Sequence, residues 1–348
     1  MAEPRISVVI RSFNEQNHIE RLLIGIFEQS IPDVEVILVD SGSTDRTLSI
    51  AGKYPVQIHS IPPHEFSFGG SLNLGCRSAR GQFIVLASAH VYPVYQDWLE
   101  KLTAPFADPK VAVVYGKQCG NAQTKYSEQR IFLKWYPPKS NSAQNHPFCN
   151  NANAAIRRAV WEKMPYDETL TGLEDIDWAK RVFKLCYRIA YAAEAEVVHV
   201  HSETPRGIFN RYRREALAMK RIFPEESFSA WDFLRLFTQN TASDIVHAVA
   251  DHALWGNLTG IFTFRLVQFW GTYRGYTQRG PISQRLRQTL YYPASREMSD
   301  SAEPNSEKQP EECRLRIQYT QEKDHGGARA VSGYFHASAS RNTPMAGE

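Results

Sequence analysis

The chain has 348 residues, of which 43% are hydrophobic and 12% are aromatic. This composition argues against wholesale disorder, and the length allows one large core with an accessory region. The net charge of +3 is too small to indicate a nucleic-acid-binding protein. Five scattered cysteines without a CxxC pair favour reduced thiols in a cytoplasmic protein over a zinc site or a disulfide framework. The sequence contains no run of about 18 apolar residues, which is the length that predicts a membrane-spanning helix.

The first hundred residues alternate between strand and helix patterns. Apolar and β-branched runs predict strands at residues 6–10, 34–40, 56–61 and 82–87. Helical spacing predicts helices between them, one of which would be capped by Ser43 or Thr44. Because the apolar runs are continuous, we expect a mostly parallel sheet covered by helices on both faces.

The remaining residues fall into three parts. Strands are expected at 111–116 and near 189–201, and helices near 158–164 and 174–186. From 226 the pattern becomes helical and aromatic, and from 294 polar residues dominate without periodicity. We therefore predict a catalytic or binding domain, a helical accessory region and a disordered tail, with the boundaries 1–225, 226–293 and 294–348.

Three predicted strands end in polar residues that should converge at one edge of the sheet, where parallel sheets bind their ligands. These ends are residues 11–15, 40–43 and 88–90. A carboxylate at Asp40 can accept the imide N–H of uracil or thymine, and the Ser-Gly-Ser turn after it lets backbone amides approach a ribose or phosphate. The alternative is that Asp40 forms an Asx turn or caps a helix.

Several segments together resemble family 2 glycosyltransferases, which have the GT-A fold. They read "SVVIRSFNE", "VEVILVDSGSTDRT", "FSFGGSLNLGCRSARGQFIVLASAH", "FCNNANAAIRRAVWEKMPYDETLTGLEDIDWAKRV" and "IAYAAEAEVVHVHS". The resemblance covers roughly residues 5–220 and is greatest to the bacterial branch that includes rhamnosyltransferases. It implies an α/β GT-A fold, a Rossmann-like nucleotide-sugar-binding domain with a mixed, mostly parallel sheet, to which the chain adds a C-terminal helical extension.

The resemblance also implies an activity, which is inverting transfer of a sugar from a UDP- or dTDP-sugar to a glycan or a lipid-linked acceptor in polysaccharide biosynthesis. Asp40 would contact the donor base, and the asparagine-rich segment at 150–153 would lie beneath the donor sugar unless it is an ordinary loop. An arginine common in relatives is missing after Ser71, and Arg77 or Arg80 would take its place at the phosphates. The residues expected to bind the donor are Ser12, Asn14, Glu15, Asp40, Ser41, Ser43, Asn73, Arg80, Ser88, Asn151 and Asn153.

Glu174 and Asp175 begin a predicted helix, and Gly172 would permit a tight turn before it. An inverting transfer needs one base for the proton of the acceptor hydroxyl, and a carboxylate suits that role. The alternative is that these acids cap the helix and pair with Lys180 or Arg181. The resemblance places the family's Glu-Asp pair on Glu174 and Asp175, with Asp175 as the base and Asp177 in support.

The segment Ser88-Ala89-His90 stands where many sugar-nucleotide enzymes have two aspartates around one residue. Those aspartates hold a divalent cation, Mn²⁺ or Mg²⁺, against the leaving diphosphate. Three interpretations are open. His90 joins His199 or His201 to hold a cation, positive side chains replace the cation, or the protein binds sugar nucleotides without catalysis.

Two further features bear on partners. The basic residues from Arg206 to Arg221 would contact the diphosphate or anionic lipid headgroups, or form a solvated helix face. The aromatic segment 254–270 would contact a membrane surface, pack as an accessory helix or form a dimer surface. We expect a cytoplasmic protein, with peripheral contact to the inner face of the membrane as one option. A nucleotidyltransferase and a dinucleotide-binding oxidoreductase are disfavoured, because neither phosphate-binding loop is present at the required position.

Overall fold

The computed structural model describes four stretches of the chain, residues 5–280, 286, 290–291 and 314–319. The chain divides into two units, Met1–Ile317 and Gln318–Glu348, and every helix and strand named below belongs to the first. The predicted disordered tail lies outside the described residues except for 314–319, and the predicted domain boundaries stay predictions.

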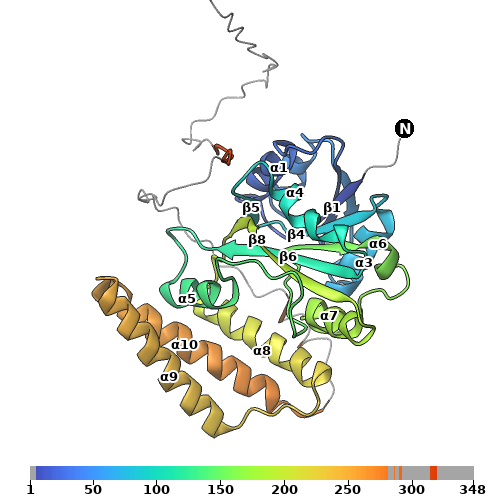
Figure 1. Cartoon of the computed structure of the whole chain (residues 1–348). Helices are drawn as coiled ribbons and strands as arrows, with labels where there is room; N and C mark the ends of the chain where they lie inside the picture. Colours follow the sequence, from blue (N-terminus) through green and yellow to red (C-terminus); the bar gives the residue numbers. More distant parts are fainter. Residues whose placement is uncertain (1–4, 281–285, 287–289, 292–313, 320–348) are drawn as a thin grey trace, which may run out of the picture. The chain divides into compact units, whose positions relative to one another are not determined.

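An eight-stranded sheet runs through the first unit in the order β3-β2-β1-β4-β7-β6-β8-β5 (Figure 1). Its strands are β1 (Ile6–Ser12), β2 (Glu35–Asp40), β3 (Gln57–Ser60), β4 (Phe83–Ser88), β5 (Val91–Pro93), β6 (Val111–Cys119), β7 (Asn153–Arg157) and β8 (Arg188–His199). The strands β1 to β4 are parallel to one another, as are β6 and β8. The strand β7 runs antiparallel to β4 and β6, and β5 runs antiparallel to β8. The predicted mixed sheet is confirmed.

Helices cover both faces of this sheet, which explains why the strands are apolar on both sides. The helices of this part are α1 (Ile19–Phe27), α2 (Thr47–Ala51), α3 (Phe68–Ser78), α4 (Trp98–Thr103), α5 (Tyr126–Trp135), α6 (Arg158–Trp161) and α7 (Glu174–Lys184), with a 3-10 turn at Ala104–Ala107. Residues of α1 and α4 pack on one face around Val8 and Val85. Residues of α3, α6 and α7 pack on the other around Val9 and Ile84.

The predicted helix cap at Ser43 or Thr44 is wrong. The helix α2 begins at Thr47 and follows Arg46, which provides no side-chain cap. The Ser43 hydroxyl donates to Asp40 instead, and the Asp45 carboxylate accepts the backbone N–H of Thr47 at 2.9 Å. The Ser43 oxygen accepts the backbone N–H of Asn14, so the donor that it serves lies on the loop after β1 and not in α2.

Three long helices, α8 (Pro205–Ile222), α9 (Ala230–Ala250) and α10 (Leu254–Tyr276), complete the unit. In Figure 1, α10 lies between α8 and α9, and it contacts both. Inside this helical layer the Arg265 guanidinium pairs with the buried Asp244 carboxylate at 2.8 Å and also donates to the backbone oxygen of Ser127 on α5. The ion pair thus joins α9, α10 and α5.

Glycines on α10 set how closely it approaches α8. A Cβ at Gly275 would lie 2.5 Å from the Cβ of Ala216 and 2.6 Å from the backbone oxygen of Arg213. A Cβ at Gly271 would lie 2.5 Å from the backbone oxygen of Phe209. Only glycine permits this contact, so the packing of α10 against α8 depends on glycine at both positions.

A matched pair of substitutions on α10 tests this dependence. We expect Gly275→Ala to lower the free energy of unfolding by about 1–3 kcal/mol, because the added methyl group overpacks the contact with α8. Gly260→Ala meets nothing within 4 Å. It should raise the free energy of unfolding by roughly 0.5–1 kcal/mol through helix propensity. Urea unfolding followed by circular dichroism measures both, and equal changes would contradict the close packing.

Candidate active site

The carboxyl ends of three strands meet at one edge of the sheet. In the register of the sheet, Ser12 at the end of β1 stands opposite Asp40 of β2, and Arg11 stands opposite Ser88 of β4. Parallel strands end on the same side, which is why residues so far apart in the chain become neighbours. The expected convergence of these polar strand ends is therefore present.

Asp40 lies within a closed set of hydrogen bonds and is 1% exposed. One carboxylate oxygen accepts from the hydroxyls of Ser12 at 3.0 Å and Ser43 at 2.5 Å. The other accepts from the backbone N–H groups of Gly42 and Ser43 at 2.9 and 2.8 Å. This is the Asx-turn alternative, and direct contact of Asp40 with a nucleotide base stays a prediction.

The loops after β1 and β2 are joined to each other. Asn14 adopts a left-handed backbone with φ of 54°, and its side-chain oxygen accepts the backbone N–H of Thr44 at 2.8 Å. Its own N–H donates to the Ser43 hydroxyl, and the N–H of Glu15 donates to Thr47 at 2.7 Å. Asparagine tolerates this conformation better than most residues. The two loops therefore form one rigid rim.

Three other residues expected to bind the donor lie apart from this rim. Asn73 is buried and bonds to Trp161, Tyr166 and Glu168. Asn153 is buried between the indole of Trp98 and backbone oxygens of β6 and β8. Arg80 pairs at 2.7 Å with Glu35, which begins β2, so it lies at the opposite end of the strands. The sheet does not bring these three side chains together with Ser12 and Asp40.

Glu174 and Asp175 begin α7 as expected, but the tight turn before the helix is at Leu173, whose φ is 55°, and not at Gly172. Arg11 pairs with Glu174 at 3.0 Å. Asp175 makes no ion pair among the described residues and accepts the backbone N–H groups of Ile176 and Asn151 at 2.8 and 3.2 Å. The two neighbouring carboxyls thus have different surroundings.

Burial raises the pKa of Asp175 to about 7, with a further contribution from the negative charge of Glu174. The backbone donors and Arg11 oppose this shift only in part. A carboxyl with this pKa can both take and release a proton near neutrality, which is the property a general base needs.

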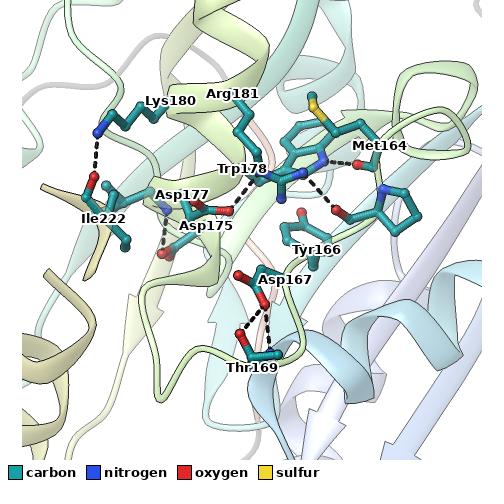
Figure 2. Close-up of polar contacts among 12 residues, drawn as sticks. Met164, Tyr166, Asp167, Thr169, Asp175, Asp177, Trp178, Lys180, Arg181 and Ile222 are labelled. Atoms are coloured by element: carbon teal, nitrogen blue, oxygen red, sulfur yellow. Dashed lines mark hydrogen bonds and ion pairs between the residues drawn. The ribbon is translucent and has the colours of Figure 1, made fainter. Parts of the chain in front are cut away.

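The alternative of helix-surface ion pairs describes Asp177 and not its neighbours. Figure 2 shows Asp177 paired with Arg181 one turn further along α7, at 2.8 Å. Lys180 pairs with no acid in the part of the chain that the structure describes and donates instead to the backbone oxygen of Ile222 (Figure 2). The carboxylate of Asp175 is not used in an ion pair of this kind among the described residues.

His90, His199 and His201 form a cluster next to the strand ends. Their ligand atoms lie within 4.8 Å of one another, and the rings of His199 and His201 are 4.0 Å apart. The Nδ1 atom of each ring contacts an acceptor: Glu15 for His90 at 2.7 Å, Gln118 for His199 at 2.7 Å and Glu128 for His201 at 2.8 Å.

The cluster fits a divalent cation. The Nε2 atom of His199 is buried and has no hydrogen-bond partner, which is costly unless another ligand is present. Burial, followed by the neighbouring cations and histidines, holds the pKa of His199 well below its usual value, so the ring is neutral as metal binding requires. Acceptors behind metal-binding histidines orient the rings in the same way. Imidazole ligands favour a transition metal over magnesium.

Several side-chain contacts at the site had no signal in the sequence. Arg11 belongs to the polar strand end expected at residues 11–15 but had no expected partner, and Gln118 and Glu128 come from elements outside the recognised motifs. Their contacts with Glu174, His199 and His201 arise only from the fold. A sequence pattern predicts the histidines but not the residues that orient them.

The basic residues from Arg206 to Arg221 make different kinds of contact in the folded structure. Arg211 pairs with Glu128 and Glu203, and Arg221 contacts Thr169. Arg214 lies with its guanidinium 4.5 Å from the ring centre of Phe68, and its Nε atom is buried without a hydrogen-bond partner. The guanidinium of Arg11 lies 5.1 Å from the centre of the same ring. Two arginines of the site therefore share one aromatic support.

Known proteins are similar to this chain in sequence and in fold. Residues 7–164 match the family described as Glycosyl transferase family 2. The O-antigen chain rhamnosyltransferase WbaN of Salmonella anatum is 33% identical over 190 residues, which are 51% of this chain and 60% of that protein. The O-antigen chain rhamnosyltransferase RfbN of Salmonella typhimurium strain LT2 is 28% identical over 221 residues, which are 60% of this chain and 70% of that protein.

Among solved structures, the mannosyltransferase PcManGT from Pyrobaculum calidifontis in complex with GDP-Man and Mn²⁺ is similar in fold. The TM-score is 0.53 at 21% identity, over 85% of this chain and 89% of that one. At this identity the likeness concerns the fold alone. The predicted resemblance to family 2 glycosyltransferases and the predicted GT-A fold are both confirmed, with the family match extending over residues 7–164.

Proposed function

We propose that this protein transfers a sugar from a nucleoside-diphosphate donor to a hydroxyl of a glycan or a lipid-linked acceptor, with inversion and with Asp175 as the general base. The observation that carries the proposal is the state of Asp175. It is half-buried at a helix start, is held by two backbone donors and has a pKa of about 7. The family match and the relatives named as rhamnosyltransferases support the reaction class.

The donor would bind at the rim formed by Ser12, Asn14 and the turn from Ser41 to Ser43. This rim offers hydroxyl groups and backbone amides, the groups suited to a nucleoside and its phosphates. Because Asp40 is fully hydrogen-bonded, its role would be to hold the turn in place. We propose a UDP- or dTDP-sugar, and the two named relatives favour a deoxyhexose such as rhamnose.

His90, His199 and His201 would hold a divalent cation at the leaving diphosphate. Such an ion supplies Lewis-acid stabilisation of the negative charge that develops on the leaving group. The solved mannosyltransferase of similar fold contains Mn²⁺ with GDP-Man, which supports this assignment. Arg11 and Arg214 would add positive charge beside it.

A sugar-nucleotide-binding protein without catalysis is the second candidate. It is favoured by Ser88, which replaces the first carboxylate of the usual metal motif. Hydrolysis of a panel of nucleotide sugars, alongside their binding measured by calorimetry, separates the two. Binding without turnover of any donor, with or without metal, would support this second candidate.

The α9–α10 hairpin supports peripheral contact with a membrane. No helix in the described part of the chain has both the length and the hydropathy to cross a bilayer. However, the exposed ionisable side chains between Arg235 and Arg274 are only Asp251 and His252, both next to the turn. The exposed large apolar residues of the hairpin are Trp231, Leu234, Val246, Val249, Trp255, Phe262, Leu266 and Trp270. Aromatic and aliphatic side chains on such a surface suit the lipid interface, with Arg235 and Arg274 near anionic headgroups.

Changing Asp175 to Asn tests the base. We expect kcat for donor hydrolysis, in which water replaces the acceptor hydroxyl, to fall about 10²- to 10⁴-fold. Wild-type activity should rise with pH through about 7 and then level, because Asp175 must lose its proton first. Asp177→Asn is the matched control and should retain both activity and profile. Full activity in the Asp175 variant would exclude it as the base.

Metal binding gives a separate test of the histidine cluster. Mn²⁺ titration followed by electron paramagnetic resonance should show one site in the wild type. His199→Ala should weaken binding by more than about 10-fold, because it removes the buried ligand. His247→Ala, on α9 and bonded to the backbone of Ser243, should leave binding unchanged. If neither EDTA nor the variant alters donor hydrolysis, positive side chains have replaced the cation.

Vesicle sedimentation tests the membrane contact. The wild type should co-sediment with phosphatidylglycerol vesicles more than with phosphatidylcholine vesicles. The double substitution Trp255→Ser and Phe262→Ser should weaken binding roughly 10-fold or more, since two apolar side chains leave the interface. Leu185→Ser is the control, because Leu185 is 61% exposed but lies outside the hairpin. Equal binding by all three proteins would contradict the assignment.

A further inference from the structure

A cavity of about 600 Å³ lies beside the C-terminal end of α5, under the loop at residues 136–149. Its walls include Tyr115 from β6, Tyr191 from β8, Trp135 from the end of α5 and Phe148 from the loop. None of these residues belongs to the strand-end rim or to the histidine cluster. The volume is within the range of about 300–1,000 Å³ that small-ligand sites occupy.

The walls are aromatic, and Trp135 is the exposed ring among them. The ring of Trp135 stacks on that of Phe148 at 4.7 Å, and the ring of Tyr115 meets Phe148 edge-on at 5.4 Å. Trp135 is nevertheless 44% exposed, so much of its indole is open to a ligand. Aromatic faces carry partial negative charge, and the C–H groups on one side of a pyranose ring are weakly positive. A sugar ring can therefore stack on Trp135.

The cavity is held in shape by its own polar contacts. The Tyr115 hydroxyl donates to the side-chain oxygen of Gln144 at 2.9 Å, while the amide of Gln144 donates to the backbone oxygens of His146 and Phe148. Asn141 exchanges two backbone hydrogen bonds with Tyr191 at the edge of β8. A wall that is already ordered costs little entropy when a ligand binds.

The remaining polar groups suit a hydroxyl-rich ligand. Lys134 and Lys139 line the cavity together with Asn141, and no carboxylate is among the described lining residues. Ammonium and amide groups donate to sugar hydroxyls, and the lysines also accommodate a carboxylate or a phosphate on a glycan. The combination of aromatic faces and scattered donors is that of a saccharide site.

The loop connects this cavity directly to Asp175. Phe148 precedes Cys149, whose thiol donates to the backbone oxygen of Asp175 at 3.4 Å. Two residues later, the N–H of Asn151 donates to the Asp175 carboxylate. The three residue-to-residue steps from Phe148 to Asn151 span at most about 11 Å. The cavity is thus close to the residue that would activate the acceptor.

We infer that this cavity binds a sugar unit of the acceptor glycan, away from the unit that carries the attacking hydroxyl, with its ring stacked on Trp135. The assignment to the acceptor rests on the proposed function, because it takes Asp175 as the base. Binding of a saccharide to the cavity does not depend on that role.

Saturation-transfer NMR with a panel of short oligosaccharides tests the inference. The panel contains neutral and acidic saccharides built from deoxyhexoses, hexoses and N-acetylhexosamines. We expect binding by the wild type, with an affinity at least about 10-fold lower in Trp135→Ala. Trp135→Phe keeps an aromatic face and should retain most of the affinity. Leu133→Ala is the matched control on α5, since Leu133 is 64% exposed and does not line the cavity.

Calorimetry with UDP and dTDP on the same proteins identifies which site each change affects. Nucleotide binding should be unchanged in Trp135→Ala. Loss of nucleotide binding in that variant would overturn the inference, as would saccharide affinities equal to those of the wild type, or no binding of any saccharide by the wild type. Failure of the proposed function would appear differently, as saccharide binding that depends on Trp135 in a protein whose donor hydrolysis is insensitive to Asp175→Asn.

Discussion

The buried carboxylate of Asp40 holds together the edge of the sheet on which the candidate site is built. It accepts hydrogen bonds from Ser12 on β1 and from the turn after β2, so it ties two strand ends into one unit. A buried carboxylate without such donors would be strongly destabilising. The position of Ser43, and through it that of Asn14, follows from satisfying this one charge.

The same demand for satisfied polar groups applies to the cluster of His90, His199 and His201. The negative charge lies one layer further out, on Glu15 behind His90 and on Glu128 behind His201. Burial alone would lower the pKa of His90, but Glu15 outweighs burial and the net shift is upward. Glu128 has its pKa lowered to about 2, because His201 and Arg211 overcome the effect of its burial. The carboxylates of Glu15 and Glu128 therefore balance the positive side chains of the cluster, although the strand end at residues 88–90 has no carboxylate of its own.

Glu174 and Asp175 show how neighbouring residues of the same chemistry acquire different roles. Arg11 pairs with Glu174, whereas the hydrogen bonds that the structure describes to the Asp175 carboxylate come from backbone N–H groups. A pair of neighbouring carboxyls in different surroundings is the usual basis of acid–base assignments in enzymes. The loop that donates to Asp175 also forms the wall of the aromatic cavity. Proton transfer and recognition of the acceptor would therefore share one structural support.

The sequence by itself determined six of the eight strands, the resemblance to the family and the set of polar strand ends, because these depend on local hydrophobic periods and on motifs. The short strand β5 and the antiparallel strand β7 were not predicted. It also placed His90 and His199 as candidate partners across more than a hundred residues. It could not reveal that Leu173 and not Gly172 makes the tight turn, since that depends on how α7 packs, nor that Ser43 serves Asp40 and not α2.

Side-chain contacts between distant elements were decided by the tertiary structure. Arg11 of β1 meets Glu174 of α7, Gln118 of β6 meets His199 of β8, and Trp135 of α5 meets Phe148 only after these elements are assembled. Burial is likewise a property of the assembled fold, and burial is the main cause of the raised pKa of Asp175. Sequence periodicity reports which residues face a core, whereas the environment of each charge is set by every element packed around it.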